Sequence, residues 1–235
     1  MSGMREIVLD TETTGFEPEE GHRIVEIGAV ELFNHMPTGN TYHQYINPER
    51  PMPKEAFEVH GLGNEFLADK PKFVEVGLDF LEFIGTDSVL VIHNAKFDMK
   101  FLNAELRWAG MPLIPDDRAL DTLAMARRRF PGSPATLDAL CRRFSIDNSA
   151  RTLHGALLDS EILAEVYLEL IGGRQPGFGL HPVDSAQKNA AGVNEAWRPK
   201  PRPEPLPPRL TAEESEAHSA FVGKLGEAAI WHRYD

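Results

Sequence analysis

Apolar and polar positions along the first part of the chain predict three β-strands. Residues 5–9 form a short apolar run that ends at Asp10, residues 23–32 alternate, and residues 41–47 alternate until Pro48 stops them. The connections between these segments are short. We therefore expect an antiparallel meander.

The hydrophobic period then changes to that of helices. Apolar residues at helical spacing predict one helix after Pro71 and a second that ends near Leu106. Their apolar positions are Phe73, Val76, Phe80 and Phe83 in the first and Phe97, Phe101, Leu102 and Leu106 in the second. Residues 88–92, between them, are so short and apolar that they predict a central strand.

Further elements follow up to about residue 173. We expect a short strand at 119–122, helices at 122–129 and 136–144, and a long helix at 155–170 that ends at Gly172 and Gly173. Three strands followed by alternating helices and strands indicate an α/β fold, with a mixed sheet flanked by helices.

The composition shifts after Gly173. Six of the ten residues 199–208 are proline, so residues 174–209 are expected to form a stiff, extended linker. Residues 210–235 then carry a thin apolar stripe at helical spacing. Its members are Ala217, Phe221, Leu225 and Ala228, followed by Trp231. Such a helix either folds back on its own domain or docks on a partner, and the pattern alone leaves both open.

Composition narrows the class of protein. Hydrophobic residues make up 42% and charged residues 26%, which is typical of a soluble globular protein. The single cysteine, Cys141, excludes an internal disulfide and a cysteine-based zinc site, and we expect it in a helical core. Neither a signal-peptide pattern nor an apolar run of membrane length is visible, so a cytoplasmic location is expected.

The net charge of −12 argues against a strong, autonomous DNA binder. Two interpretations remain. The chain has no nucleic-acid role, or bound metal ions supply positive charge while a partner supplies most of the grip on the polymer.

Acidic residues gather at the predicted ends of elements. Asp10 and Glu12 lie two apart where a strand ends, so both point to one side of the sheet. Such a pair is costly unless a cation lies between the two charges. Asp98 falls in the first turn of a helix, where the macrodipole favours a negative charge even without a functional role. Glu12 could equally be an ordinary polar loop residue.

His154 and Asp159 form the last part of this pattern. Five residues apart on one helix, they would be separated by about 140°. They can converge only if His154 lies in the preceding loop and the helix begins near Gly155. The simpler interpretation is that His154 is a cap or a solvent-exposed residue.

The three segments together resemble the motifs of a known family. Residues 10–15 (DTETTG), 93–98 (HNAKFD) and 154–159 (HGALLD) resemble the three exonuclease motifs of the DEDDh 3′→5′ exonucleases, in the same order. More narrowly, the chain is similar to the epsilon proofreading subunits of bacterial DNA polymerase III. Residues 59–62 resemble their substrate loop, and the similarity extends, more weakly, over residues 210–231. The resemblance implies a ribonuclease H-like exonuclease fold with a five-stranded mixed sheet and an extended C-terminal tail.

The resemblance also implies a reaction. Two divalent ions, Mg²⁺ or Mn²⁺, would be bound by carboxylates. Asp10 would bridge both ions, Glu12 and Asp159 would complete one site, and Asp98 would hold the other ion. His154 would act as the general base, and a histidine here rather than a tyrosine is typical of the h branch.

Substrate contacts follow from the same resemblance. Glu55 and His60 would contact the terminal nucleotide, and Thr13 would pack near it. Phe97 would either wedge beside the terminal base or serve as a core aromatic. The substrate would be a frayed or single-stranded DNA 3′ end, and the product a nucleoside 5′-monophosphate.

The tail would bind partners. Residues 175–180 resemble a sliding-clamp peptide with Gln175, Phe178 and Leu180 as anchors. Phe221, Leu225 and Trp231 would dock on the alpha subunit of polymerase III, and a small accessory subunit is a further partner of similar proteins.

Two other hypotheses compete with a proofreading exonuclease. A stand-alone DEDDh nuclease that trims RNA or short oligonucleotides would need neither the proline-rich linker nor a docking helix. A non-catalytic adaptor that stabilises a polymerase would not need all five catalytic residue types, which this chain retains.

Overall fold

The computed structural model describes residues 3–149, 151, 153–172 and 210–225. The chain divides into two units, and each is described by itself. The first contains all strands and most helices of the described residues, and the second contains helix α8 (Ala212–Leu225).

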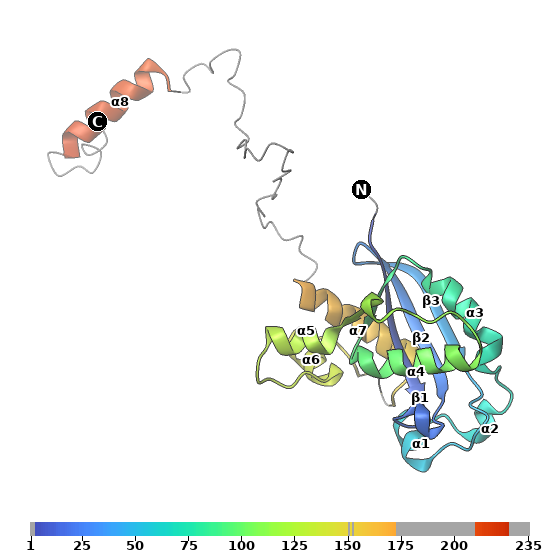
Figure 1. Cartoon of the computed structure of the whole chain (residues 1–235). Coiled ribbons are helices and arrows are strands. Elements are labelled where there is room, and N and C mark those ends of the chain that lie inside the picture. Colours follow the sequence, from blue (N-terminus) through green and yellow to red (C-terminus); the bar gives the residue numbers. More distant parts are fainter. Residues whose placement is uncertain (1–2, 150, 152, 173–209, 226–235) are drawn as a thin grey trace, which may run out of the picture. The chain divides into compact units, whose positions relative to one another are not determined.

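The first unit is built on a five-stranded sheet, as the sequence predicts. Its strand order is β3-β2-β1-β4-β5 (Figure 1). The strands are β1 (Arg5–Thr13), β2 (Ile24–Phe33), β3 (Met36–Tyr45), β4 (Val89–Ile92) and β5 (Ala119–Asp121). β1, β2 and β3 pair antiparallel, whereas β4 pairs parallel with β1 and with β5. The predicted mixed sheet and the central position of β4 are both confirmed.

Helices cover both faces of this sheet. They are α1 (Lys54–His60), α2 (Asn64–Leu67), α3 (Phe73–Ile84), α4 (Ala95–Trp108), α5 (Thr122–Arg129), α6 (Leu137–Phe144) and α7 (Ala156–Ile171), with short 3-10 turns η1 (Pro18–Glu20) and η2 (Asp116–Arg118). The predicted helices α3 to α7 are confirmed to within about two residues at nearly every end.

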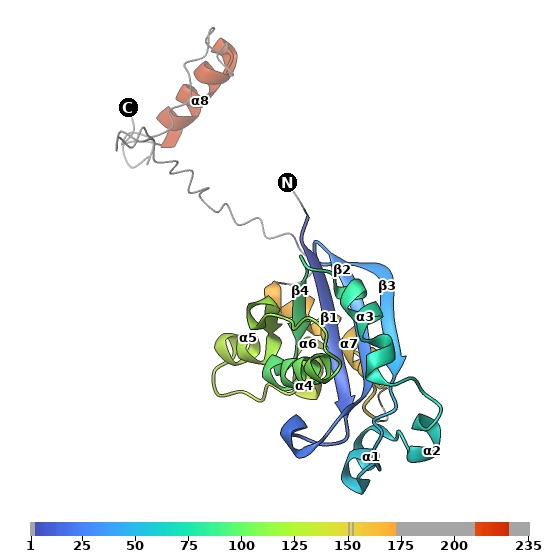
Figure 2. The same cartoon turned by 45° about the vertical axis from the view of Figure 1, so that its right-hand side comes forward.

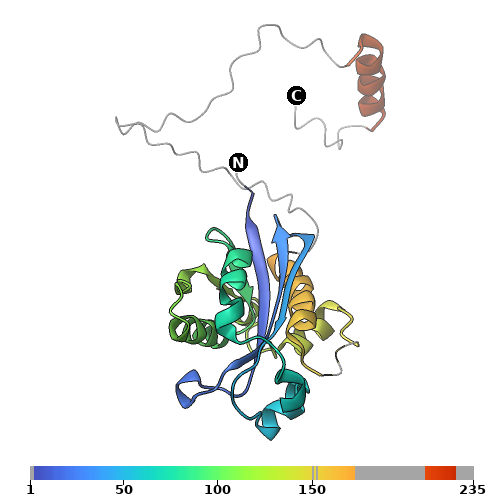
Figure 3. The same cartoon turned by 90° about the vertical axis from the view of Figure 1, so that its right-hand side faces the viewer.

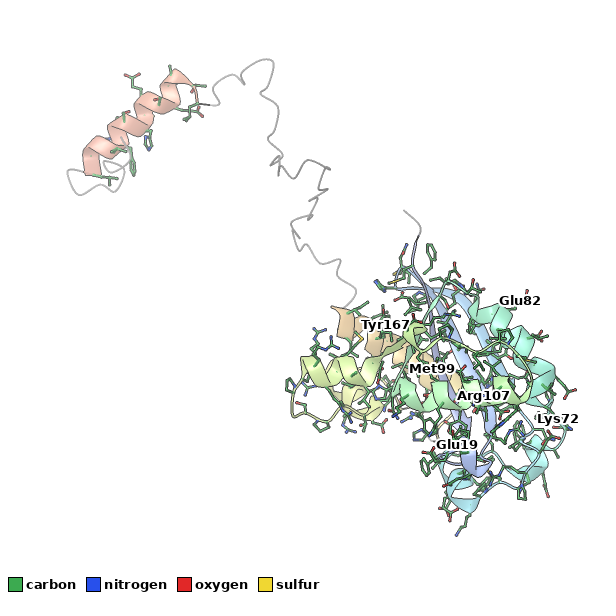
Figure 4. All side chains as sticks on the ribbon, viewed as in Figure 1. Glu19, Lys72, Glu82, Met99, Arg107 and Tyr167 are labelled. Atoms are coloured by element: carbon green, nitrogen blue, oxygen red, sulfur yellow. The ribbon has the colours of Figure 1, made fainter. Side chains whose placement is uncertain are left out.

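Alternation along β1 decides which residues meet which helices. The odd residues Ile7 and Leu9 pack in the cluster that contains α3 and α4. The even residue Val8 packs against α7. On the same face as Val8, Glu6 accepts a hydrogen bond at 2.5 Å from the hydroxyl of Tyr167, which is labelled in Figure 4. Figure 3 shows the sheet between α3 and α4 on one side and α7 on the other.

Some boundaries differ from the prediction. β1 continues to Thr13, so Asp10 and Glu12 lie within the strand and not beyond its end. The third strand is Met36–Tyr45, not 41–47, because Asn34 and His35 adopt positive φ angles of 49° and 64° and turn the chain directly out of β2.

The segment 59–62, predicted as a loop, is partly helical. Residues 59 and 60 form the last turn of α1, and Gly61 ends the helix with a φ of 72°. Neither α1 nor α2 is predicted from the sequence, since seven and four residues are too few to show a helical stripe.

In the second unit, the structure describes only part of the predicted tail, residues 210–225. Phe221 and Leu225 are 57% and 46% exposed on α8. Trp231, the linker, and the clamp-like residues Gln175, Phe178 and Leu180 lie outside the described residues. Within the described part of the chain, no helix is both long and apolar enough to cross a membrane.

Candidate active site at the carboxyl end of strand β1

A close contact between β2 and α7 brings two of the predicted carboxylates together. Asp10 is paired in register with Gly28 on β2. A Cβ atom on Gly28 would lie 2.1 Å from the backbone nitrogen of Leu157, so only glycine allows the first turn of α7 to rest on the strand. Ser160 reinforces the contact by donating to the Gly28 carbonyl at 2.9 Å. Asp159 on α7 therefore lies beside the even face of β1.

Asp98 reaches the site from the other face of the sheet. The turn after β4 places Asn94 at a φ of 66°, and α4 begins directly after it. Asp98 is 2% exposed and accepts hydrogen bonds from the backbone N–H of Thr11 at 3.1 Å and from the Thr11 hydroxyl at 2.7 Å. Thr11 thus orients this carboxylate, a role that sequence reasoning missed.

Three of the carboxylates have pKa values well above the ordinary range. Burial is the main cause, and neighbouring carboxylates add to it: the pKa of Asp10 is raised strongly, that of Glu12 to about 8 and that of Asp98 to about 7. Glu26, opposite Glu12 in the sheet, contributes as well. Several buried carboxylates facing one another fit a site for divalent cations, which prefer such oxygen ligands.

Asp159 differs from the other three. Burial acts to raise its pKa, but hydrogen bonds from His154 and Arg151 hold it below the ordinary value. Arg151 donates from Nε to Oδ1 at 2.5 Å and from Nη2 to Oδ2 at 2.7 Å, and its third nitrogen donates to Asp138 at 2.8 Å. The arginine side chain is only 9% exposed.

Arg151 also contacts the predicted base. Its Nη2 lies 2.8 Å from Nδ1 of His154, and the same ring nitrogen lies 3.4 Å from Asp159. Sequence reasoning missed Arg151, because nothing in the local pattern separates it from an ordinary solvated arginine.

The loop before α7 carries His154, as the spacing argument requires. Gly155 is the N-cap of α7, and the His154 N–H donates to the carbonyl of Val59 at 3.1 Å. The loop is thereby linked to the end of α1. Possible ligand atoms of Glu12, His154 and Asp159 all lie within 4.8 Å of one another. The structure therefore brings together the predicted catalytic residues, with His154 48% exposed at the opening.

Two adjoining cavities meet at these residues. The first, of about 700 Å³, is lined by Asp10, Asp98, His154 and Asp159 among others. The second, of about 450 Å³, is lined by all four predicted substrate residues, Thr13, Glu55, His60 and Phe97. Thr11, Glu12 and Phe97 line both. Phe97 also packs against the core and against Phe101, with ring centroids 5.0 Å apart, so it serves the core and the cavities together.

His60 offers a hydrogen bond in the second cavity. It is 5% exposed, and burial lowers its pKa despite the nearby Thr13 carbonyl. Its Nδ1 accepts from the Leu62 N–H at 3.0 Å, so the neutral ring carries its proton on Nε2. That nitrogen has no hydrogen-bond partner among the described residues. A buried donor without a partner fits a ligand acceptor in the cavity.

Comparison with known proteins decides the family. Residues 7–167 match the family model described as Exonuclease. The chain is 52% identical to the DNA polymerase III subunit epsilon of Rickettsia felis, over 97% of this chain and 100% of the relative. It is 44% identical to the corresponding subunit of Escherichia coli K12, over 97% of each chain.

The chain belongs to the DEDDh exonuclease family, in the branch of DNA polymerase III epsilon subunits.

Membership of this branch makes the chain a proofreading 3′→5′ exonuclease, which confirms the family and the activity predicted from the sequence. The family also implies divalent metal ions, in agreement with the carboxylate cluster.

Solved structures share the fold of this epsilon-type domain. Exonuclease X, in complex with 5′ overhanging duplex DNA, superimposes with a TM-score of 0.55 at 27% identity, over 72% of this chain and 90% of that one. The nuclease domain of 3′hExo, bound to rAMP, gives a TM-score of 0.63 at 20% identity, over 72% and 92%. The second likeness concerns the fold alone.

Proposed function

We propose that this chain removes mispaired nucleotides one at a time from DNA 3′ ends as part of a replicative polymerase. The observation that supports this most is the meeting of two cavities, one lined by four carboxylates and His154 and the other by the predicted nucleotide contacts. The first suits hydrolysis of a phosphodiester. The second has room for one terminal nucleoside.

The four carboxylates together would hold two divalent ions, Mg²⁺ or Mn²⁺. Asp10 would be shared by both ions, Glu12 and Asp159 would complete one site, and Asp98 would hold the other ion. Such ions would supply positive charge to the attacking and leaving oxygens of the in-line displacement. The site fits them because burial and neighbouring carboxylates raise the pKa values of Asp10, Glu12 and Asp98, a penalty that divalent charge would remove.

His154 takes the proton from the attacking water. Its imidazole is exposed at the opening of the catalytic cavity, and histidine changes charge near neutral pH. In the tautomer whose Nδ1–H donates to Asp159, Nε2 has a free lone pair and can accept this proton. The bond from phosphorus to the 3′ oxygen of the penultimate nucleotide breaks, and a nucleoside 5′-monophosphate leaves.

The second cavity binds the terminal nucleotide without identifying its base. His60 donates from Nε2, Glu55 accepts at the rim, and Thr13 and Phe97 supply contact surface. Selectivity for mismatches then comes from the lower cost of unstacking a frayed end.

The tail holds the exonuclease in its complex. The relatives that match over 97% of this chain are named as polymerase III subunits, which supports docking over a stand-alone RNA-trimming enzyme. Phe221 and Leu225, exposed on α8, together with Trp231, dock on the alpha subunit. Gln175, Phe178 and Leu180 bind the sliding clamp, and a small accessory subunit is a further partner.

Digestion of a 5′-labelled primer tests the function. The primer is paired, mismatched at its 3′ end, or made of RNA, and wild type is compared with His154→Ala in Mg²⁺ and in chelator. We expect a metal-dependent ladder from the 3′ end, faster on the mismatch, and at least about 100-fold slower in the variant. His218→Ala on α8 serves as the matched histidine control. Preference for RNA would instead support the trimming enzyme, and full activity of His154→Ala would refute the assigned base.

A further inference from the structure

Positive charge in this acidic chain is concentrated in one segment. Between Thr122 and Phe144 there are five arginines and a single acidic residue, Asp138, whereas the whole chain has a net charge of −12. The arginines are Arg127, Arg128, Arg129, Arg142 and Arg143. Asp138 is itself paired with Arg151, so the segment presents almost no free negative charge.

Folding brings these arginines next to the catalytic cavity. Helices α5 and α6 both pack on α7 through a shared apolar cluster that includes Ala126 and Leu140, and Figure 1 and Figure 2 show the two helices next to each other. Arg127 lines the catalytic cavity together with Pro134. Pro134 also lines an adjoining depression of about 450 Å³, whose other lining residues are Ala139, Arg142 and Arg143. The two hollows therefore adjoin at Pro134, and together we call them the arginine path.

Most of these arginines have no structural partner that would explain them. Arg129 is used structurally, since it donates to the carbonyls of Glu169 and Leu170 at the end of α7. Arg143 lies flat over Phe130, with its guanidinium 4.3 Å from the ring centroid. In the described parts of the chain, Arg127, Arg128 and Arg142 form no ion pair within 4 Å, and all three are exposed.

The position and the positive charge of the arginine path fit a nucleic-acid strand. If the terminal nucleoside lies in the second cavity and its phosphate at the carboxylates, the remaining strand must leave the catalytic cavity. Helices α5 and α6, which carry these arginines, line the catalytic cavity but not the second cavity, which it meets at Thr11, Glu12 and Phe97. Guanidinium groups bind phosphate oxygens through paired hydrogen bonds, and a polymer substrate supplies phosphates at regular spacing.

We propose that Arg127, Arg142 and Arg143 bind the backbone phosphates of the DNA strand upstream of the nucleotide being removed. This inference rests on the proposed function and adds a surface that guides the strand. It also refines the expectation that a partner supplies most of the grip: the acidic remainder keeps affinity low, while this arginine path sets the direction of the strand.

The test uses the full chain with the double variant Arg142→Ala/Arg143→Ala, because neither arginine lines the catalytic cavity. The matched control is Lys72→Ala/Arg107→Ala, which removes the same charge from residues that lie outside both cavities and are labelled in Figure 4. Substrates are a nitrophenyl ester of thymidine 5′-monophosphate, a dinucleotide and an oligothymidylate of about 12 residues.

We expect a loss that depends on substrate length. The double variant should hydrolyse the ester and the dinucleotide like wild type, but lose about tenfold in kcat/KM on the long strand, mainly through KM. The slope of log(kcat/KM) against log salt should become shallower by about 1.4, which is about 0.7 for each of two phosphate contacts on a single strand. The control variant should retain the slope and the activity.

Three results would overturn the proposal: an equal loss on the ester, no loss on the long strand, or the same loss in the control. Fluorescence anisotropy of a labelled strand, measured in chelator, keeps the test independent of hydrolysis. If wild type binds DNA through these arginines but hydrolyses no substrate, the proposed function fails and the surface stands. If DNA hydrolysis is unchanged but binding to an acidic polymerase subunit is lost, the surface serves a protein and the proposal is wrong.

Discussion

The two sides of the active site hold their carboxylates in opposite ways. On the sheet side, the pKa values of Asp10, Glu12 and Asp98 are raised, mainly by burial. On the side of α7, Asp159 is only 3% exposed, but Arg151 and His154 keep its pKa low. Without bound cations, the carboxylates on the sheet side destabilise the fold. On the α7 side, Arg151 already neutralises the charge of Asp159. The site therefore contains carboxylates that need bound metal ions, and it also contains Arg151, which competes with those ions for Asp159.

Opposite changes in stability would be the clearest sign of this difference. In chelator, Asp10→Asn should raise the free energy of unfolding by about 2 kcal/mol, because it removes a buried like charge. Arg151→Ala should lower it by about 3 kcal/mol, because Asp159 loses its buried partner. Urea unfolding measures both, and Arg128→Ala, an exposed arginine on α5, is the control for loss of charge. Shifts of the same sign in the two variants would contradict the comparison.

The pH dependence of the metal-free protein separates the two sides further. Glu12 has its pKa raised to about 8, so the folded protein binds a proton that the unfolded chain has already lost above its ordinary value of 4.5. Its contribution to stability is present at low pH and is lost as the pH rises towards about 8.

Replacing this carboxylate isolates its effect. The gain in unfolding free energy from Glu12→Gln should rise by about 3 kcal/mol between about pH 5 and about pH 8. Asp159, with a lowered pKa, stabilises the fold throughout this window and loses that contribution only in acid, as the pH falls through its folded pKa. The measurement is urea unfolding in chelator across this range. A gain that shrinks as the pH rises would refute the assignment of Glu12.

Metal affinity gives the smallest expected effect. Thr11→Val removes the hydroxyl that donates to Asp98 and should weaken Mg²⁺ binding about tenfold, as measured by calorimetry. Arg151→Ala should shift the same titration the other way, because a competitor for Asp159 is gone. Thr38→Val, which removes a hydroxyl that bonds to Glu31 far from the carboxylates, serves as the control. Equal affinities in all variants would show that neither neighbour tunes the site.

Most of the sheet could be predicted from local alternation, whereas the carboxylate cluster was predicted from the resemblance of three segments to the DEDDh motifs. Helix geometry added that His154 must lie in the loop before α7 if it is to meet Asp159. The turn at Asn34 and His35 was missed, since no glycine marks it. α1 was missed because Lys54–His60 has no apolar stripe.

Contacts between residues far apart in the sequence could not be predicted from local pattern. The bonds from Thr11 to Asp98 join residues 87 positions apart. Arg151 looks in the sequence like an ordinary solvated arginine, and only the packing of its loop against α7 buries it beside Asp159. The charge of α5 and α6 was visible in the sequence, but its meaning depended on the cavity that these helices border.

The requirement for glycine at position 28 has a consequence for the mutation rate of the cell. A single methyl group there would collide with the backbone of α7, and Asp159 could then no longer lie beside Asp10. If the tail docks on the polymerase as proposed, such a subunit would still join it while leaving copying errors in place. A cell that carried this one codon change would accumulate mutations in every other gene before it lost any part of its replication machinery.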